Sequence, residues 1–117
     1  MWLDSFTGKA TFVAIDDNGT LTGFVDCEPQ TGLIDRLFVA ANRQGEGIGS
    51  ALLARAEAAV ERSVSTFTVY ASPTARIFFE RSGYTIVTPN LVTRTYTKNG
   101  IVRIIDLKNF QMQKSRD

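Results

Sequence analysis

The sequence contains no histidine and a single cysteine, Cys27. Without histidine, the chain lacks the usual general base and the commonest metal ligand. A cysteine hydrolase needs a base beside its thiol, so the lone Cys27 argues against that class. Because histidine is absent and cysteine occurs once, we also expect no metal site. One cysteine cannot form an internal disulfide, which fits a reducing compartment. We therefore expect a cytoplasmic protein.

The sequence also has little net charge and no long apolar run. Its formal net charge is +1, which gives no electrostatic basis for a nucleic-acid partner. No apolar segment is long enough to cross a bilayer, and the first ten residues have neither the basic nor the apolar region of a signal peptide. The 117 residues, 44% of them apolar and 21% charged, predict one globular domain over residues 1–117 that interacts with neither membranes nor nucleic acids.

Three strands are predicted in the first third of the chain, over residues 10–15, 21–28 and 33–39. The first two form a hairpin around residues 16–19, whose Asp-Asp-Asn-Gly sequence is a strong turn signal. The apolar alternation of residues 33–39 is imperfect, which favours a central strand covered on both faces.

Two helices are predicted after these three strands. Apolar residues recur at helical spacing over residues 48–62, and a short strand is predicted over 66–71. Ser72 and Pro73 are start signals for a second helix, and Arg81 and Gly83 are its stop signals. A last hairpin turns at residues 99–100, between a strand that starts near residue 84 and one that extends to residue 113. The order β-β-β-α-β-α-β-β predicts an α/β or α+β fold whose mixed, mostly antiparallel sheet has a central parallel β-α-β crossover.

A glycine-rich loop lies between the third strand and the first helix. Its sequence, Gln44-Gly45-Glu46-Gly47-Ile48-Gly49, fits Q-x-x-G-x-G and matches neither the P-loop nor the dinucleotide-binding pattern. Glycines allow close approach of the backbone to a ligand, and the helix start beyond them offers unpaired N–H groups. The loop therefore predicts a phosphate site, the alternative being turn glycines without a ligand.

The sequence around this loop resembles the GNAT superfamily of acetyltransferases. Residues 37–53 resemble the family's central cofactor motif, and residues 71–84 resemble its next motif, a helix that ends at a Gly-aromatic pair. The amino-acid sequences of residues 34–39, 71–72, 78–81 and 109–114 are most similar to those of the YafP-like branch. Family members usually begin with a strand and two helices, whereas this chain begins almost at the second strand. Residues 1–9 are expected to supply a short cap with Trp2, Leu3 and Phe6 as apolar anchors.

The resemblance implies an acyl-CoA cofactor, acetyl-CoA in the first place. The pantetheine arm is expected along the strand before the loop, and the pyrophosphate on the loop itself. The second helix is expected beside the thiol end, although core packing is the alternative for one of Phe78 and Phe79. The implied cofactor-binding residues are Leu37, Phe38, Val39, Gln44, Gly45, Glu46, Gly47, Ile48, Gly49, Ser50, Ser72, Ala75 and Phe79.

The implied chemistry is direct attack of an amine on the thioester. Asp35 is the candidate base because it is expected on the same side of its strand as Leu37 and Val39; an ion pair with Arg36 or Arg76 is the alternative. Many family members carry a tyrosine, the general acid, where this chain has Phe79. Tyr70 or Tyr84 is the candidate acid, and unassisted departure of the thiolate is the alternative.

Two functions remain open at this point. The first is an N-acetyltransferase acting on a small-molecule or peptide amine. The second is a reduced GNAT-fold module that binds acyl-CoA, or a protein partner, without turnover. Because the absent first helices would leave part of a sheet face exposed, we also expect a homodimer.

Overall fold

The structure is a computed structural model. It describes the backbone of residues 2–4, 8–98 and 100–116, and the side chains of residues 8–88, 100 and 110–116. The chain forms two compact units, Met1–Thr68 with Lys114–Asp117, and Val69–Gln113. The single domain expected over residues 1–117 stays a prediction.

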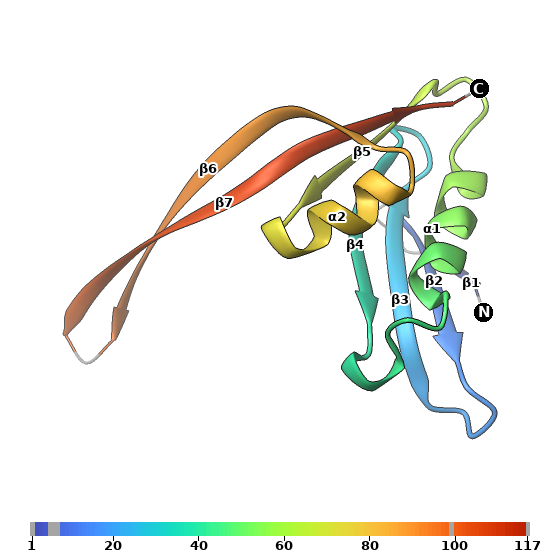
Figure 1. The fold of residues 1–117 in the computed structure, drawn as a ribbon, viewed down its shortest axis with the longest axis horizontal. Helices are drawn as coiled ribbons and strands as arrows, with labels where there is room; N and C mark the ends of the chain where they lie inside the picture. The colour runs from blue at the N-terminus through green and yellow to red at the C-terminus, as the bar shows by residue number, and fades with distance from the viewer. Residues whose placement is uncertain (1, 5–7, 99, 117) are drawn as a thin grey trace. The chain divides into compact units, whose positions relative to one another are not determined.

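The first unit is built on a sheet in which β1 to β4 pair antiparallel (Figure 1). Its strands follow one another in chain order, and Thr68 N–H donates to Gly32 O at 2.9 Å, beside the start of the fourth strand. The strands are β1 (Trp2–Asp4), β2 (Ala10–Ile15), β3 (Leu21–Glu28), β4 (Leu33–Val39) and the first half of β5 (Thr66–Ala71). The predicted bounds of β2 to β5 are confirmed, and the mostly antiparallel, mixed sheet with one parallel pair is the fold class expected.

Residues 2–4, part of the segment expected to form a cap, belong to the sheet. Trp2–Asp4 form a strand, β1, that pairs antiparallel with β2 in the register Trp2 to Phe12. The edge of β2 provides backbone hydrogen-bond partners for this short segment, which was not predicted to be a strand. The side chains expected to act as apolar anchors, those of Trp2, Leu3 and Phe6, lie outside the described residues.

A β-bulge interrupts β4 at Asp35. Asp26 of β3 pairs with Arg36, and the next residue, Cys27, pairs with Ile34, so Asp35 is the extra residue on β4. The expectation that β4 is covered on both faces is wrong, because Asp35, Arg36 and Phe38 are exposed. The bulge, and not burial on both sides, explains the imperfect alternation of this strand.

One helix, α1 (Ile48–Ala59), packs on β2, β3 and β4. A short 3-10 helix, η1 (Ala41–Arg43), precedes it. The helix was expected to continue to residue 62, but Val60 has an extended backbone (ψ 137°) and ends it. The core of this unit consists of the buried apolar residues Ala10, Phe12, Val25, Cys27, Ile34, Leu52, Leu53, Ala56, Val60 and Phe67.

The second unit contains the end of β5, helix α2 (Pro73–Arg81), and strands β6 (Thr85–Lys98) and β7 (Ile101–Ser115). The helix starts as predicted, because the Ser72 hydroxyl accepts from Ala75 N–H at 3.1 Å. Gly83 ends it with φ 99°. β6 and β7 form a long antiparallel ribbon whose two strands twist around each other (Figure 1). The predicted last hairpin is confirmed, although Asn99 of its turn lies outside the described residues. In the part of the chain that the structure describes, no helix is long and apolar enough to cross a membrane.

Candidate functional site

The glycine loop presents its backbone to open space. Gly45 and Gly47 have φ of 85° and 81°, in the left-handed region that favours glycine. A Cβ atom added to either glycine would meet no other atom within 4 Å. The positive φ explains why glycine is found here, and the open space is what a ligand lying against this backbone needs.

The start of α1 supplies the polar groups of the site. Gly47 is the N-cap residue, and no side chain caps the helix. The first intrahelical bond runs from Ala51 N–H to Gly47 O at 3.0 Å, so the amides of Ile48, Gly49 and Ser50 have no partner within the helix. The first turn also contains no acidic side chain. These amides and the positive end of the helix dipole form a binding site for an anionic group such as a phosphate.

An arginine connects the loop to the turn between β2 and β3. Arg43 donates from Nε to both carboxylate oxygens of Glu46, at 3.0 and 3.1 Å, and from Nη1 to Asp16 Oδ2 at 3.1 Å. Asp16 is itself held by the backbone N–H groups of Asn18 and Thr20. The hydrogen bond and charge of Glu46, and then Asp16, raise the pKa of the Arg43 guanidinium.

The strand that leads into the loop carries the three residues expected along the pantetheine arm. Leu37 and Val39 are half-buried and pair with β3 residues that face α1, whereas Phe38 is 48% exposed. The Phe38 ring lies 5.8 Å from that of Phe24, centroid to centroid. Gln44, at the start of the motif, donates from its amide to Val39 O at 3.5 Å, across the end of β4.

Asp35 forms an ion pair with Lys9, and both side chains are about one third exposed. The ion pair that was the alternative to a base role is therefore present, but its cation is not an arginine. Arg36 instead donates to the buried carboxylate of Asp26, which also accepts from the Thr11 hydroxyl at 2.6 Å. Because Asp35 is the bulged residue, the alternation that would place it on the same side as Leu37 and Val39 does not run through it.

The second unit contains the remaining predicted residues. Phe79 is 6% exposed and meets the ring of Tyr84 edge-on, with centroids 5.5 Å apart. Tyr84 itself is 2% exposed, whereas Tyr70 on β5 is 52% exposed. Ser72 and Ala75 are joined by the capping hydrogen bond at the start of α2. The geometry therefore gives Phe79 a packing role, which was the alternative for one of the two phenylalanines.

A comparison with protein-family models decides the affiliation. Residues 2–104 match the model described as "Acetyltransferase (GNAT) domain". The chain belongs to the GNAT acetyltransferase family. A search of curated protein sequences found no significant match.

Solved structures of GNAT acetyltransferases share this fold. A GCN5-related N-acetyltransferase from Rhodopseudomonas palustris is 30% identical, with a TM-score of 0.67 over 94% of this chain and 63% of that one. A nourseothricin acetyltransferase is 27% identical, with a TM-score of 0.70 over 92% of this chain and 65% of that one. The PaiA N-acetyltransferase from Thermoplasma acidophilum, solved with coenzyme A, is 17% identical; its TM-score is 0.68 over 93% of this chain and 62% of that one. The chain thus spans less than two thirds of the length of these three GNAT proteins.

One residue that positions the glycine loop, Gly23, was not predicted from the sequence. A Cβ atom on Gly23 of β3 would lie 2.7 Å from Phe38 O, 3.0 Å from Leu52 Cδ1 and 3.2 Å from Ile48 Cγ2. Gly23 therefore sets how closely the first turns of α1 approach the sheet. A glycine inside a predicted strand was the available signal, because it often marks such a close approach.

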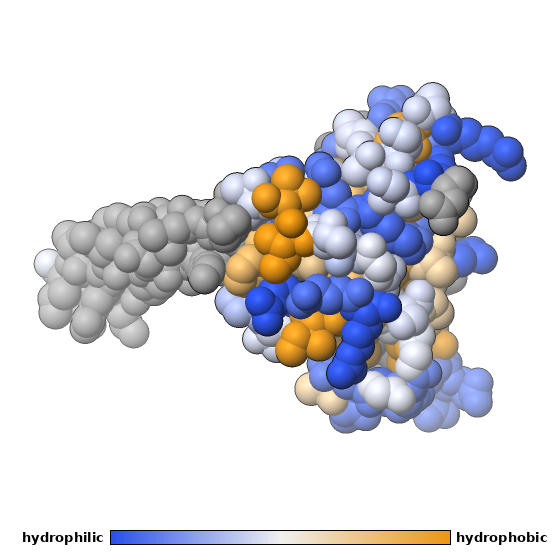
Figure 2. Space-filling model, turned by 45° about the horizontal axis from the view of Figure 1, so that its top comes forward, coloured by the Kyte–Doolittle hydropathy of each residue, from blue (hydrophilic) through white to orange (hydrophobic). Residues whose placement is uncertain are grey.

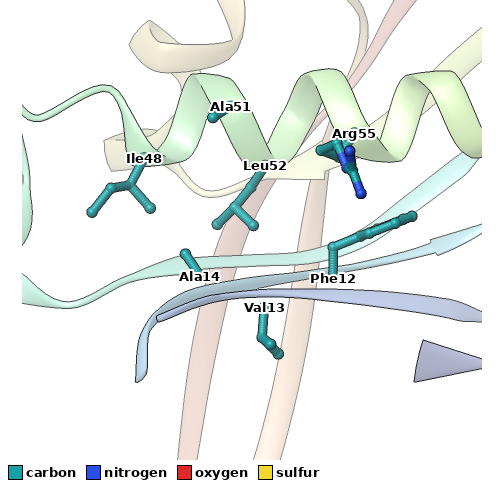
Figure 3. A pocket seen from close by; sticks show the side chains of 7 residues that line it. All are labelled: Phe12, Val13, Ala14, Ile48, Ala51, Leu52 and Arg55. Atoms are coloured by element: carbon teal, nitrogen blue, oxygen red, sulfur yellow. The ribbon is translucent and has the colours of Figure 1, made fainter. Parts of the chain in front are cut away.

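A small apolar hollow of about 230 Å³ lies beside this contact, between α1 and β2. Figure 3 shows Ile48, Leu52 and Arg55 of α1 pointing toward Phe12 and Ala14, whereas Val13 points away from them. The Arg55 guanidinium carbon is 5.5 Å from the Phe12 ring centroid. The lining of the hollow is mainly aliphatic and aromatic. The hollow therefore belongs to the packing between helix and sheet and not to the phosphate site.

Proposed function

We propose that this GNAT domain binds acetyl-CoA, or another acyl-CoA, and transfers the acyl group to a small-molecule or peptide amine. The observation that carries the proposal is the start of α1. Three amides there have no partner in the helix, no side chain caps them, and the glycine backbone before them borders open space. An anionic group is the ligand that such a helix start binds.

The proposed seat of the pyrophosphate is the backbone of Gln44–Gly49, together with Ser50. Leu37, Phe38 and Val39 are proposed to contact the pantetheine arm, and Ser72, Ala75 and Phe79 its thiol end. Support comes from the PaiA structure, which has this fold and was solved with coenzyme A. The 48% exposure of Phe38 supports a contact surface on β4, whereas Phe79, which is 6% exposed, offers little surface for such a contact.

Bound acetyl-CoA supplies a thioester carbonyl, which an amine attacks to form an amide with release of the thiol. The amine must lose a proton, and Asp35 is the proposed base because its carboxylate is partly exposed on the strand leading to the loop. Lys9 contacts one oxygen of that carboxylate, Oδ2, so the proton would be taken by the other oxygen, Oδ1. As proton donor to the thiolate we propose Tyr70, which is accessible to solvent, ahead of Tyr84, which is buried.

The Asp35–Lys9 ion pair also favours a second candidate function. The carboxylate is already engaged by a lysine, and Phe79 has no proton to donate. A domain with these features could bind acyl-CoA, or a protein partner, without turnover. Cofactor binding is therefore tested separately from acetyl transfer.

The first experiment is a thermal-shift and calorimetric titration of the purified chain with acetyl-CoA, CoA and ADP. Ligand at 100 times its dissociation constant stabilises the folded state by about 2.7 kcal/mol, which raises the melting temperature by several degrees. Saturable binding supports the phosphate site, and an amine screen for turnover then separates the two candidate functions. No binding at millimolar acetyl-CoA would contradict the proposed function.

Gly47→Asn tests the position of the site, because asparagine tolerates positive φ and its side chain would fill the open space. Gly19→Asn is the matched control: Gly19 has φ 78°, and an added Cβ would also meet no atom within 4 Å, but it lies in the turn before β3. We expect Gly47→Asn to weaken CoA binding about tenfold or more, the effect of losing one good phosphate contact, and Gly19→Asn to leave it unchanged. Equal affinities for the two variants would place the phosphate elsewhere.

The homodimer and the cytoplasmic location remain proposals. Large apolar side chains are exposed in both units, among them Leu21 and Phe38 in the first and Ile77 and Val87 in the second. Figure 2 shows such hydrophobic surface as orange patches among hydrophilic residues on one face. Light scattering coupled to size-exclusion chromatography tests the dimer, and a monomer at micromolar concentration would contradict it.

A further inference from the structure

The glycine loop contains an acidic residue where an anionic ligand is expected. Glu46 lies between Gly45 and Gly47, and its side chain is 47% exposed. An unpaired carboxylate next to the free amides of α1 would repel a phosphate group, because like charges a few ångströms apart disfavour each other. The site therefore needs a cation that offsets this charge.

Arg43 is that cation. Its Nε atom contacts both oxygens of the Glu46 carboxylate, at 3.0 and 3.1 Å, so the carboxylate is oriented toward the guanidinium. The remaining side of the guanidinium is fixed by Asp16, which is 17% exposed and held by two backbone amides. The position of Arg43 is thus determined by the β2–β3 turn as well as by the loop.

We propose that Arg43 is a positioning residue of the phosphate site, which restrains and neutralises Glu46 so that the loop can accept the pyrophosphate of an acyl-CoA. This inference rests on the proposed function. Glu46 then lowers the affinity for the cofactor, and Arg43 restores most of it. Both side chains are partly exposed, so the effect must depend on ionic strength.

The test is a charge cycle in which the dissociation constant for CoA is measured by calorimetry. Arg43→Gln should weaken binding by about threefold to tenfold, the range expected for one partly screened charge, and Glu46→Gln should strengthen it by a similar factor. The double variant Arg43→Gln/Glu46→Gln should return to within about twofold of the parent, because it removes the unpaired carboxylate along with its partner.

Three further measurements distinguish this role from a structural one. Arg43→Lys keeps the charge and should retain the affinity of the parent. Asp16→Asn removes the anchor but leaves the Arg43–Glu46 pair, and should change affinity less than Arg43→Gln. In about 1 M salt, where the screening length falls to ~3 Å, the difference between Arg43→Gln and the parent should shrink. A loss through misfolding would persist in salt and in the double variant.

Failure of this inference differs from failure of the proposed function. A parent protein that binds neither CoA nor ADP contradicts both. A parent that binds CoA, with Arg43→Gln within twofold of it at low salt, contradicts only the role of Arg43. Weak binding by the double variant, equal to that of Arg43→Gln, would likewise show that Arg43 acts otherwise than through Glu46.

Discussion

The guanidinium of Arg116 lies over the ring of Phe67, with 5.0 Å between the guanidinium carbon and the ring centroid. The same guanidinium donates to four backbone carbonyls at and beyond the end of α1, those of Glu57, Val60, Glu61 and Val64, at 2.7 to 3.2 Å. A helix leaves its last carbonyls without partners. Arg116 therefore caps the C-terminal end of α1, the helix that begins at the glycine loop.

Replacing Arg116 should destabilise the protein without affecting the loop. We expect Arg116→Ala to lower the free energy of unfolding by about 2–3 kcal/mol, because hydrogen bonds from a charged group contribute more than neutral ones. Urea unfolding measures this change, with Arg62→Ala as the control, since Arg62 is exposed just after α1. Similar stability of the two variants would show that the bonds from Arg116 contribute little.

Gly23→Ala should affect both stability and the cofactor site. The added methyl group would lie 2.7 Å from Phe38 O and within 3.2 Å of Leu52 and Ile48, so the first turn of α1 must move. Such overpacking costs about 1–3 kcal/mol. Urea unfolding should show this loss, and calorimetry should show weaker CoA binding. Unchanged stability would mean that the sheet and helix separate without cost.

Strands β2 to β5 and the glycine loop were predicted from the sequence, whereas the side-chain partners around the site were not. The bounds of β2 to β5 follow from local composition and turn residues such as Gly19, which has the φ of 78° that its turn requires. The loop was recognised from glycine spacing, which reflects backbone conformation and is therefore visible in sequence. Partners such as Lys9 for Asp35 and Asp16 for Arg43 join residues 26 and 27 positions apart, and no local pattern encodes them.

Cys27 should make stability depend on pH in the alkaline range. Burial, and then the charge of Asp26, raise the pKa of its thiol from 9.0 to about 11. The unfolded chain releases this proton near pH 9 and the folded chain does so later, so the contribution is fully present below pH 9 and is lost as the pH rises toward 11. The loss should amount to about 2 kcal/mol.

Urea unfolding at several values between about pH 8 and pH 11 tests this linkage, with Cys27→Ala as the comparison. Other groups titrate in this range, so the quantity of interest is the difference in slope between the parent and the variant. Cys27→Ala should be less stable at pH 8, because it leaves a cavity, but should lose less stability as the pH rises. Parallel curves would show that the thiol does not titrate as expected.

Asp35→Asn separates catalysis from binding. If Asp35 is the base, kcat should fall by about 10²-fold or more, the usual contribution of a general base, with an unchanged dissociation constant for CoA. Asp17→Asn, in the exposed turn before β3, is the control. Steady-state kinetics with any amine found in the screen measures the effect. Unchanged turnover would leave Asp35 as the structural partner of Lys9.

The bulge at Asp35 has a consequence for comparing this chain with its relatives. On either side of it the faces of β4 alternate regularly, but the two halves are out of phase, since Ile34 and Leu37 pair with Cys27 and Val25 on the same face of β3. An aligned sequence with one residue fewer at this point would keep every side chain from Arg36 to Val39 on its present face. Deleting one residue between the bulge and Phe38 instead would leave the bulge in place and turn Phe38 toward α1. Gaps placed here by sequence alignment therefore carry information about which side chains border the loop.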